Sequence, residues 1–178
     1  MGLTVTEALS ELNLIKKKVE KKREVVLNSL IRPKHLKDKL ESSGGSRDFI
    51  KAELQSVSDL LARYLKLKGA IADANIKNTI QVNGTTKSIY DWLNWKRDMS
   101  NSDLHFNNSV HQSVQKHFDS IAKQPQVFKD DDGKTHLLEY EANVEYGDFV
   151  KLAEMTQETL ERLDGQLSLK NATILLDV

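Results

Sequence analysis

Apolar residues recur every three or four positions along four stretches of the chain, the spacing that places them on one face of an α-helix. A flexible Ser-Ser-Gly-Gly-Ser loop at residues 42–46 separates the first two stretches. Pro33 stops the first helix and Pro125 stops the third, because proline cannot continue a helical hydrogen-bond ladder. The expected helices cover about residues 4–30, 46–75, 88–124 and 146–170, and a polar run at residues 100–103 can break the third.

Three other stretches have the alternating pattern of β-strands. Residues 79–82 and 85–87 flank Asn83-Gly84, the dipeptide typical of a type I′ hairpin turn. Ser88 and Asp91 then form a capping-box pattern at the start of the third helix. Residues 126–145 are expected to form a second, exposed hairpin as an insertion, and residues 173–178 a final strand.

The chain contains one internal echo, between residues 75–82 and residues 171–178. Each copy has an asparagine at a predicted helix end, where Asn can adopt a left-handed cap, followed by a short strand. If the two exits are equivalent, one small sheet holds Ile80, Val82, Leu176 and Val178. The C-terminal strand would then lie beside the Asn-Gly hairpin, which needs such support. Chance similarity over eight residues is the alternative.

These elements predict a mainly α fold, a four-helix bundle with long helices plus a small antiparallel β element made of the Asn-Gly hairpin and the C-terminal strand. We expect residues 1–178 to form a single helical domain. Long, narrow apolar stripes and only 6% aromatic residues favour association between copies of the chain.

Charge changes this picture, because it is balanced overall but uneven along the chain. Residues 1–40 hold ten Lys and Arg against five acidic residues, whereas residues 129–178 hold five against twelve. Opposite ends of this kind can attract each other within one fold or between subunits, and ordinary solvent-exposed helix faces are the alternative. The chain has no apolar run of about 18 residues and no signal-peptide pattern, so we expect no membrane partner and a cytoplasmic protein.

The sequence offers little for catalysis. It has no cysteine, which excludes thiolate metal sites, and it lacks nucleophile-elbow, Walker and dinucleotide-binding motifs. His105, His111 and His117 are six residues apart, so neighbouring histidines do not share a helix face. The acidic run before Gly133 lacks the remainder of a calcium loop. We therefore expect neither an enzyme, nor a cofactor, nor a bound metal.

A basic cluster at residues 16–23, Lys-Lys-Lys-Val-Glu-Lys-Lys-Arg, raises the possibility of nucleic-acid binding. On a helix these side chains surround most of the circumference, and the chain has an isoelectric point near 7.0, which does not suit a phosphate-tracking face. An exposed helix face is the preferred interpretation, and no nucleic-acid partner is expected.

Three stretches resemble the septicolysin-like family of uncertain function, and more closely its prophage-encoded branch. They are residues 5–12 with the following basic helix, residues 71–96, and residues 163–171, which together cover about half of the chain. Asp73 stands where the bacterial branch tends to have arginine, and Ala172 where it tends to have tryptophan. The resemblance implies a long-helix bundle with a small β element, assembled as a homo-oligomer, in an infected bacterial host.

A pocket between associated helices could hold a nucleotide-type anion. Basic residues would bind phosphate, aromatic rings would stack on a base, and polar residues at the helix ends would read a base edge or ribose. The alternative is that Trp92 and Tyr64 are core residues and that the Arg and Lys residues pair with nearby acids. The candidate residues are Arg63, Tyr64, Lys66, Asn75, Asn78, Trp92, Trp95, Lys96, Arg97, Asn171 and Thr173.

Two functions remain open. The first is a non-enzymatic phage-type oligomer that sequesters a nucleotide-derived immune signal of the host, since binding alone suffices for that task. The second is a virion structural or assembly protein, for which long amphipathic helices and oppositely charged ends would serve equally well.

Overall fold

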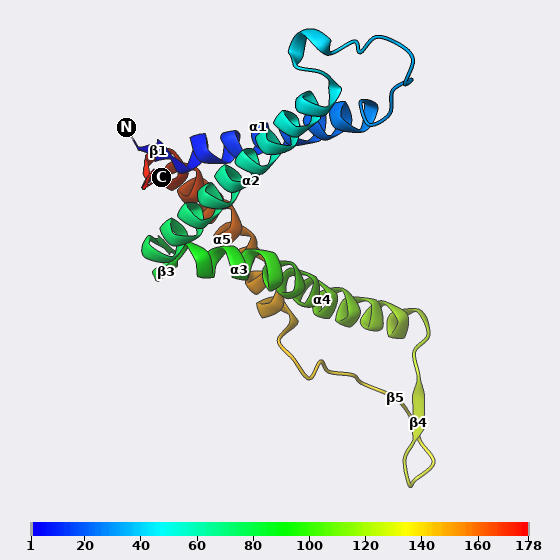
Figure 1. Cartoon of the computed structure of the whole chain (residues 1–178). Helices are drawn as coiled ribbons and strands as arrows, with labels where there is room; N and C mark the ends of the chain where they lie inside the picture. The colour runs from blue at the N-terminus through cyan, green and yellow to red at the C-terminus, as the bar shows by residue number, and fades with distance from the viewer. Residues whose placement is uncertain (1, 178) are drawn as a thin grey trace. The chain divides into compact units, whose positions relative to one another are not determined.

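The computed structural model describes residues 2–177, apart from the side chain of Ser43, and this part of the chain is mainly helical (Figure 1). Its helices are α1 (Val5–Asn28), α2 (Ser46–Lys77), α3 (Ile89–Asp98), α4 (Ser100–Lys123) and α5 (Tyr146–Thr173). Its strands are β1 (Leu3–Thr4), β2 (Thr79–Val82), β3 (Thr85–Ser88), β4 (Val127–Lys129), β5 (Thr135–Leu137) and β6 (Leu175–Leu176). A 3₁₀ turn, Glu41–Ser43, precedes α2.

The contacts divide the chain into two compact units. The first contains the residues up to Thr79 together with those from Leu167 onward, and the second contains Ile80–Gln166. A four-helix bundle within one chain is therefore not confirmed, whereas long helices with small antiparallel strand pairs are. The assignment of all 178 residues to one domain stays a prediction beside these two units.

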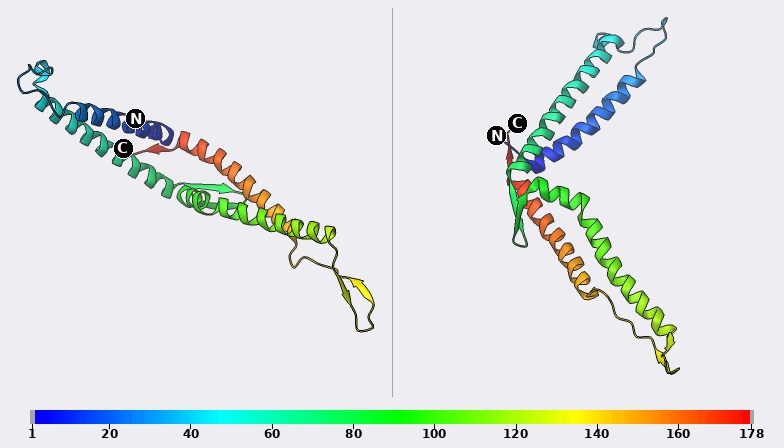
Figure 2. Two further views of the ribbon diagram at one scale, coloured as in Figure 1. Left: turned by 90° about the vertical axis from the view of Figure 1, so that its right-hand side faces the viewer. Right: turned by 90° about the horizontal axis from the view of Figure 1, so that it is seen from below.

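In the first unit, α1 and α2 lie side by side as a helical hairpin (Figure 2). The buried positions of α1 follow a three-four spacing that continues through Lys22, and those of α2 follow the same spacing through Glu53. This is the geometry of an antiparallel coiled coil. The buried cluster comprises Val5, Ala8, Leu12, Ile15, Val19, Val57, Leu67, Ile71, Ala74 and Leu176.

The second unit packs the Asn-Gly hairpin against α3 and the middle of α5. Asn83 donates a hydrogen bond from Nδ2 to Thr159 Oγ1 at 2.9 Å, and Lys96 of α3 pairs with Asp164 of α5. The backbones of α4 and α5 approach each other far less closely than those of α1 and α2. Large side chains fill this wider interval, among them Phe106 and Phe149 with ring centroids 6.1 Å apart.

The hairpin turn has the predicted form, with positive φ at Asn83 (48°) and Gly84 (79°). Ser88 caps α3 as predicted, accepting a hydrogen bond from the Asp91 N–H. The expected break in the third helix also occurs, between Asp98 and Ser100. It comes slightly earlier than the polar run suggested. The second hairpin, within residues 126–145, consists of the exposed strands β4 and β5.

The predicted partner of the C-terminal strand is wrong. β6 pairs antiparallel with β1, joining Leu176 to Leu3 and Leu175 to Thr4, while β2 pairs with β3 in a separate sheet. The sequence pattern missed β1 because two residues show no alternation. The expected common sheet of Ile80, Val82 and Leu176 therefore does not form, and Val178 lies outside the described residues.

The predicted asparagine caps are also wrong. Asn75 lies inside α2, and Asn171 lies inside α5, because each helix continues for two further residues. α2 is followed by Asn78, which is extended (φ −101°, ψ 143°) and not left-handed.

The internal echo is nevertheless longer than the sequence suggested. Each half of the described chain begins with a short strand, continues into a helix capped by Thr4 or Ser88, and finishes with a long helix and another strand. Glu7 and Asp91 occupy the same position three residues after the two caps.

Candidate anion-binding groove

The eleven predicted ligand residues are divided between the two units. Arg63, Tyr64, Lys66, Asn75, Asn78, Asn171 and Thr173 belong to the first unit, and Trp92, Trp95, Lys96 and Arg97 belong to the second. Each group is therefore considered on its own unit.

The tryptophans of the second unit serve its core more than its surface. Trp92 is only 4% exposed, and its indole Nε1 donates a hydrogen bond of 3.0 Å to the Ile80 carbonyl. Trp95 is half-buried and meets Trp92 edge to face, with ring centroids 5.6 Å apart. The suggested stacking of a ligand base on Trp92 is not available in this arrangement, because both its ring and its donor are already engaged.

The cations of α3 have carboxylate partners. Lys96 pairs with Asp164, and Arg97 pairs with its neighbour Asp98 through Nε at 2.6 Å. The Arg97 hydrogen bond holds the pKa of the Asp98 carboxyl below its usual value. This is the pairing that the sequence left open as the alternative to ligand binding.

In the first unit, Arg63 forms a two-pronged ion pair across the helical hairpin. Its Nε lies 2.9 Å from Glu11 Oε1 and its Nη2 lies 3.3 Å from Glu11 Oε2. The hydrogen bond from Arg63 lowers the pKa of Glu11, and the charges of Arg63 and Lys18 add to that effect. Arg63 thus holds α2 against α1, and Lys18 lies near enough for its field to act on the same carboxylate.

The polar residues at the helix ends bind their own backbone. Asn78 Nδ2 donates to the Ala74 carbonyl at 2.9 Å, and Thr173 Oγ1 donates to the Leu169 carbonyl at 3.0 Å. Asn75 and Asn171 are half-buried within their helices, and Lys66 is exposed on α2. No contact among these residues brings them to one ligand position in the described chain.

A groove on the same edge of the hairpin as the Arg63–Glu11 pair combines positive charge with an aromatic ring. It has a volume of about 310 Å³, and Lys18, Lys21, Lys22, Val25, Phe49 and Glu53 line it. Lys22 Nζ binds Glu53 Oε2 at 2.9 Å. Among the described side chains, no carboxylate lies within ion-pair distance of Lys18 or Lys21, so both ammonium groups keep their hydrogen-bonding capacity.

Glu11, Lys18, Lys22 and Val25 recur at helical spacings, which places them along one edge of α1. That edge therefore holds the Arg63 ion pair and the groove in a continuous line. In the groove itself three lysines, Lys18, Lys21 and Lys22, face one carboxylate, Glu53, so the local charge is positive. An anion with a planar ring could bind its charge to the lysines and its ring to Phe49.

The sequence did not identify this groove. The basic cluster was visible, but nothing in one helix indicates which of its lysines faces α2, because that depends on how the two helices pair. The useful signal was Phe49, an aromatic residue at an apolar position of the second helix opposite the basic cluster.

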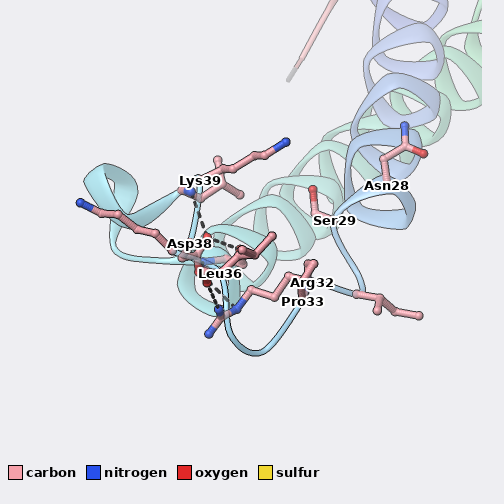
Figure 3. A pocket seen from close by; sticks show the side chains of 11 residues that line it. Asn28, Ser29, Arg32, Pro33, Leu36, Asp38 and Lys39 are labelled. Carbon is pink, nitrogen blue, oxygen red and sulfur yellow. Dashed lines mark hydrogen bonds and ion pairs between the residues drawn. The ribbon is translucent and has the colours of Figure 1, made fainter.

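A second hollow lies in the loop between α1 and α2, and Asp38 closes it (Figure 3). Its carboxylate accepts hydrogen bonds from Ser46 Oγ, Ser46 N and Leu40 N at 2.6, 2.8 and 2.9 Å, and these bonds lower its pKa to about 2. Asp38 thus fixes the start of α2. Asp38, the carboxylate that lines the hollow, is engaged in these bonds, and the hollow lacks an aromatic ring.

Within residues 2–177, no group of three His, Asp or Glu side chains could hold a metal ion, and no helix is long and apolar enough to cross a bilayer. His111 and His117 of α4 instead contact Tyr146 and Tyr140, with ring centroids 5.8 and 6.5 Å apart.

Comparison with family models, curated proteins and solved structures found no match. The resemblance to the septicolysin-like family therefore stays a prediction from three sequence stretches. The geometry of the groove is the main guide to function.

Proposed function

We propose that the protein is a non-enzymatic binding protein that works as a homo-oligomer and sequesters a nucleotide-type anion. The observation that supports this best is the groove between α1 and α2, where Lys18 and Lys21 lie beside Phe49. Lysine ammonium groups bind phosphate oxygens, and an aromatic face accepts a nucleobase. Sequestration requires these contacts alone, with no catalytic group.

In its most specific form, the ligand is a nucleotide-derived immune signal of a bacterial host, and the protein acts in the cytoplasm of an infected cell. The resemblance to prophage-encoded proteins favours this setting. Arg63 lies on the same edge of the hairpin as the groove. Of the eleven candidate ligand residues predicted from the sequence, it is the one that we include in the proposed site. A phosphate within its reach would share the guanidinium with Glu11.

Association between copies would bring several anion-binding grooves together in one assembly. Each groove, about 310 Å³, is at the lower limit for a nucleotide, and an assembly would present several of them to the ligand. We expect helical hairpins from different copies to complete four-helix bundles, because leucines on α1 and α2 remain exposed beside the coiled-coil core.

Thermal denaturation with added nucleotides tests the binding function. ADP-ribose or a cyclic dinucleotide at about 100 times its dissociation constant should stabilise the protein by about 2.7 kcal/mol, a rise in melting temperature of roughly 5–10 °C. Uncharged adenosine should produce a much smaller rise. The double variant Lys18→Glu/Lys21→Glu should lose the response while retaining its unliganded helical spectrum.

Lys116→Glu, an exposed charge reversal on α4, is the matched control and should respond as the wild type does. A nucleotide response that survives in Lys18→Glu/Lys21→Glu would contradict this site. The absence of any response to these nucleotides would contradict the sequestration function itself.

A virion structural or assembly role is the second candidate, and the exposed apolar side chains favour it. Leu61 and Leu65 on α2 are 38% and 69% exposed, and Phe106 on α4 is 59% exposed. A structural protein would grow into rings or sheets without any nucleotide, whereas a sequestering protein should stop at a small closed oligomer. The distribution of particle sizes by light scattering distinguishes the two.

A further inference from the structure

The first unit has a face that combines exposed leucines with basic residues. On α1, Leu9 and Leu27 are 40% and 67% exposed, and on α2, Leu61 and Leu65 are 38% and 69% exposed. Between them lies a shallow groove of about 180 Å³ lined by Ile15, Lys16, Val19, Glu20, Arg23, Leu61 and Tyr64. We call this set of residues the basic leucine face.

This face is distinct from the anion-binding groove. Lys16 and Arg23 are seven residues apart and therefore lie on one edge of α1, about 10.5 Å from each other along the axis. Lys18 and Lys22 lie on the opposite edge of α1, where they line the other groove. A partner could thus cover the basic leucine face while the anion-binding groove stays open.

The second unit has a face with the opposite charge. Helices α4 and α5 enclose a shallow groove of about 420 Å³ lined by Leu104, Asn108, Ala153, Glu154, Gln157, Glu158 and Glu161. Ala153 is 6% exposed and, with Leu104, supplies the apolar part of the groove. The groove is shallow and open to solvent along α4 and α5, so side chains of another copy can reach it. We call this set the acidic groove.

The two faces match in spacing as well as in charge. Glu154 and Glu161 are also seven residues apart, so their carboxylates repeat along α5 at the interval of Lys16 and Arg23 along α1. An antiparallel or parallel approach of the two helices would place both cations opposite both anions. Leu61 would meanwhile meet the apolar surface of Leu104 and Ala153.

Pairing each face with itself is less favourable. Two basic leucine faces would bring two cations and one carboxylate, Glu20, of each copy against the same set, which leaves an excess of positive charge, and two acidic grooves would oppose their glutamates. Like charges across an interface are costly and select against that partner. A second copy of this chain supplies the complementary face for both surfaces.

We infer that the basic leucine face of one copy docks into the acidic groove of a second copy. This inference rests on the proposed self-association and specifies its contact. The contact is heterologous, so each copy can use both faces, and the assembly either closes into a ring or extends as a filament. The edge of α1 that holds Lys18, Lys22 and the Arg63 ion pair remains outside the contact.

Charge reversal in trans tests the inference. One variant, Lys16→Glu/Arg23→Glu, makes the basic face acidic, and the other, Glu154→Lys/Glu161→Lys, makes the acidic groove basic. Alone, each variant should have a dissociation constant for self-association at least ~10-fold higher than that of the wild type, because its faces repel. An equal mixture should reassociate into assemblies in which the two variants alternate, since each then offers the other both complementary faces.

Glu154 and Glu161 suit this experiment because Glu158 already pairs with Arg162, whereas Glu161 accepts a hydrogen bond only from the neutral amide of Gln157. The matched controls are Lys18→Glu/Lys21→Glu on the other edge of α1 and Asp131→Lys/Asp132→Lys in the turn between β4 and β5. Both should keep the wild-type mass. Circular dichroism establishes that each variant folds. A reversal variant that does not fold is replaced by its neutral counterpart, Lys16→Gln/Arg23→Gln or Glu154→Gln/Glu161→Gln. The neutral variants should form a weaker oligomer whose mass depends less on salt.

Three results would overturn the inference. The first is that the reversal variants keep the wild-type mass. The second is that two dissociated, folded variants fail to reassociate when mixed. Either result would contradict this contact while leaving the proposed self-association intact. The third is a wild-type protein that is monomeric at all accessible concentrations, which would contradict both the contact and the proposed self-association.

Discussion

Lys22 and Glu53 face each other at core positions of the α1–α2 coiled coil, with Nζ 2.9 Å from Oε2. The three-four spacing of buried residues on each helix would accept an apolar side chain at both places. Both side chains are partly exposed, 29% and 21%, so the ions retain some water. The pair therefore fixes the register of the helices at little cost in desolvation.

Replacing one partner should cost more than replacing both. Lys22→Leu leaves Glu53 without its cation and should lower the free energy of unfolding by about 1–2 kcal/mol. Lys22→Leu/Glu53→Leu should recover this loss, because two leucines restore an apolar core layer. Urea denaturation measures both. A single variant as stable as the double would show that the pair contributes nothing to this interface.

Asp38 predicts an acid-sensitive junction between α1 and α2. Its pKa is lowered from 3.8 to about 2 by hydrogen bonds from Ser46 and Leu40, so its contribution to stability is complete above about pH 4 and disappears as the pH falls toward 2. Asp38→Asn should remove this part of the pH dependence. Melting curves between pH 2 and 5 check it, with Asp73→Asn, an exposed change on α2, as the control. Identical profiles for Asp38→Asn and the wild type would contradict the assignment.

Trp92 should be structurally more important than Trp95. Trp92→Phe removes the donor to the Ile80 carbonyl and leaves that buried acceptor unpaired, at a cost of about 1–3 kcal/mol. Trp95→Phe has no such bond to lose in the described structure and should cost less. Chemical denaturation followed by circular dichroism compares the two. Equal costs would mean that the Trp92–Ile80 bond does not anchor the hairpin on α3.

Two glycines should respond oppositely to alanine. Gly84 has φ +79° in the hairpin turn, so Gly84→Ala should destabilise the protein by about 1–2 kcal/mol. Gly69 lies within α2 with open space around it, so Gly69→Ala should stabilise by up to about 1 kcal/mol. Thermal melts of both variants provide the measurement. Destabilisation by Gly69→Ala would show that α2 needs close approach at that position.

Local signals predicted the helices and both hairpins well. The three-four spacing located α1, α2 and α5 within a few residues, and Asn83-Gly84 identified its turn, because these features depend on neighbours along the chain. The partner of β6 could not be found that way. β1 contains two residues, and the hydrogen bond from Val5 N to the Ile174 carbonyl connects opposite ends of the chain.

The candidate site was harder to predict for the same reason. The sequence shows which residues are basic, but their acidic partners lie far away along the chain: Arg63 binds Glu11, and Lys96 binds Asp164. Which cations remain available depends on the pairing of helices. Lys18 and Lys21 emerged as candidates only when α2 brought Phe49 beside them.

We propose that this protein acts as an assembly of identical chains. Sedimentation equilibrium of the wild-type protein at micromolar concentration tests it most directly. We expect a mass that is a multiple of 20.2 kDa and that decreases as salt screens the contact between basic and acidic faces. A single species of 20.2 kDa across the concentration range would contradict it.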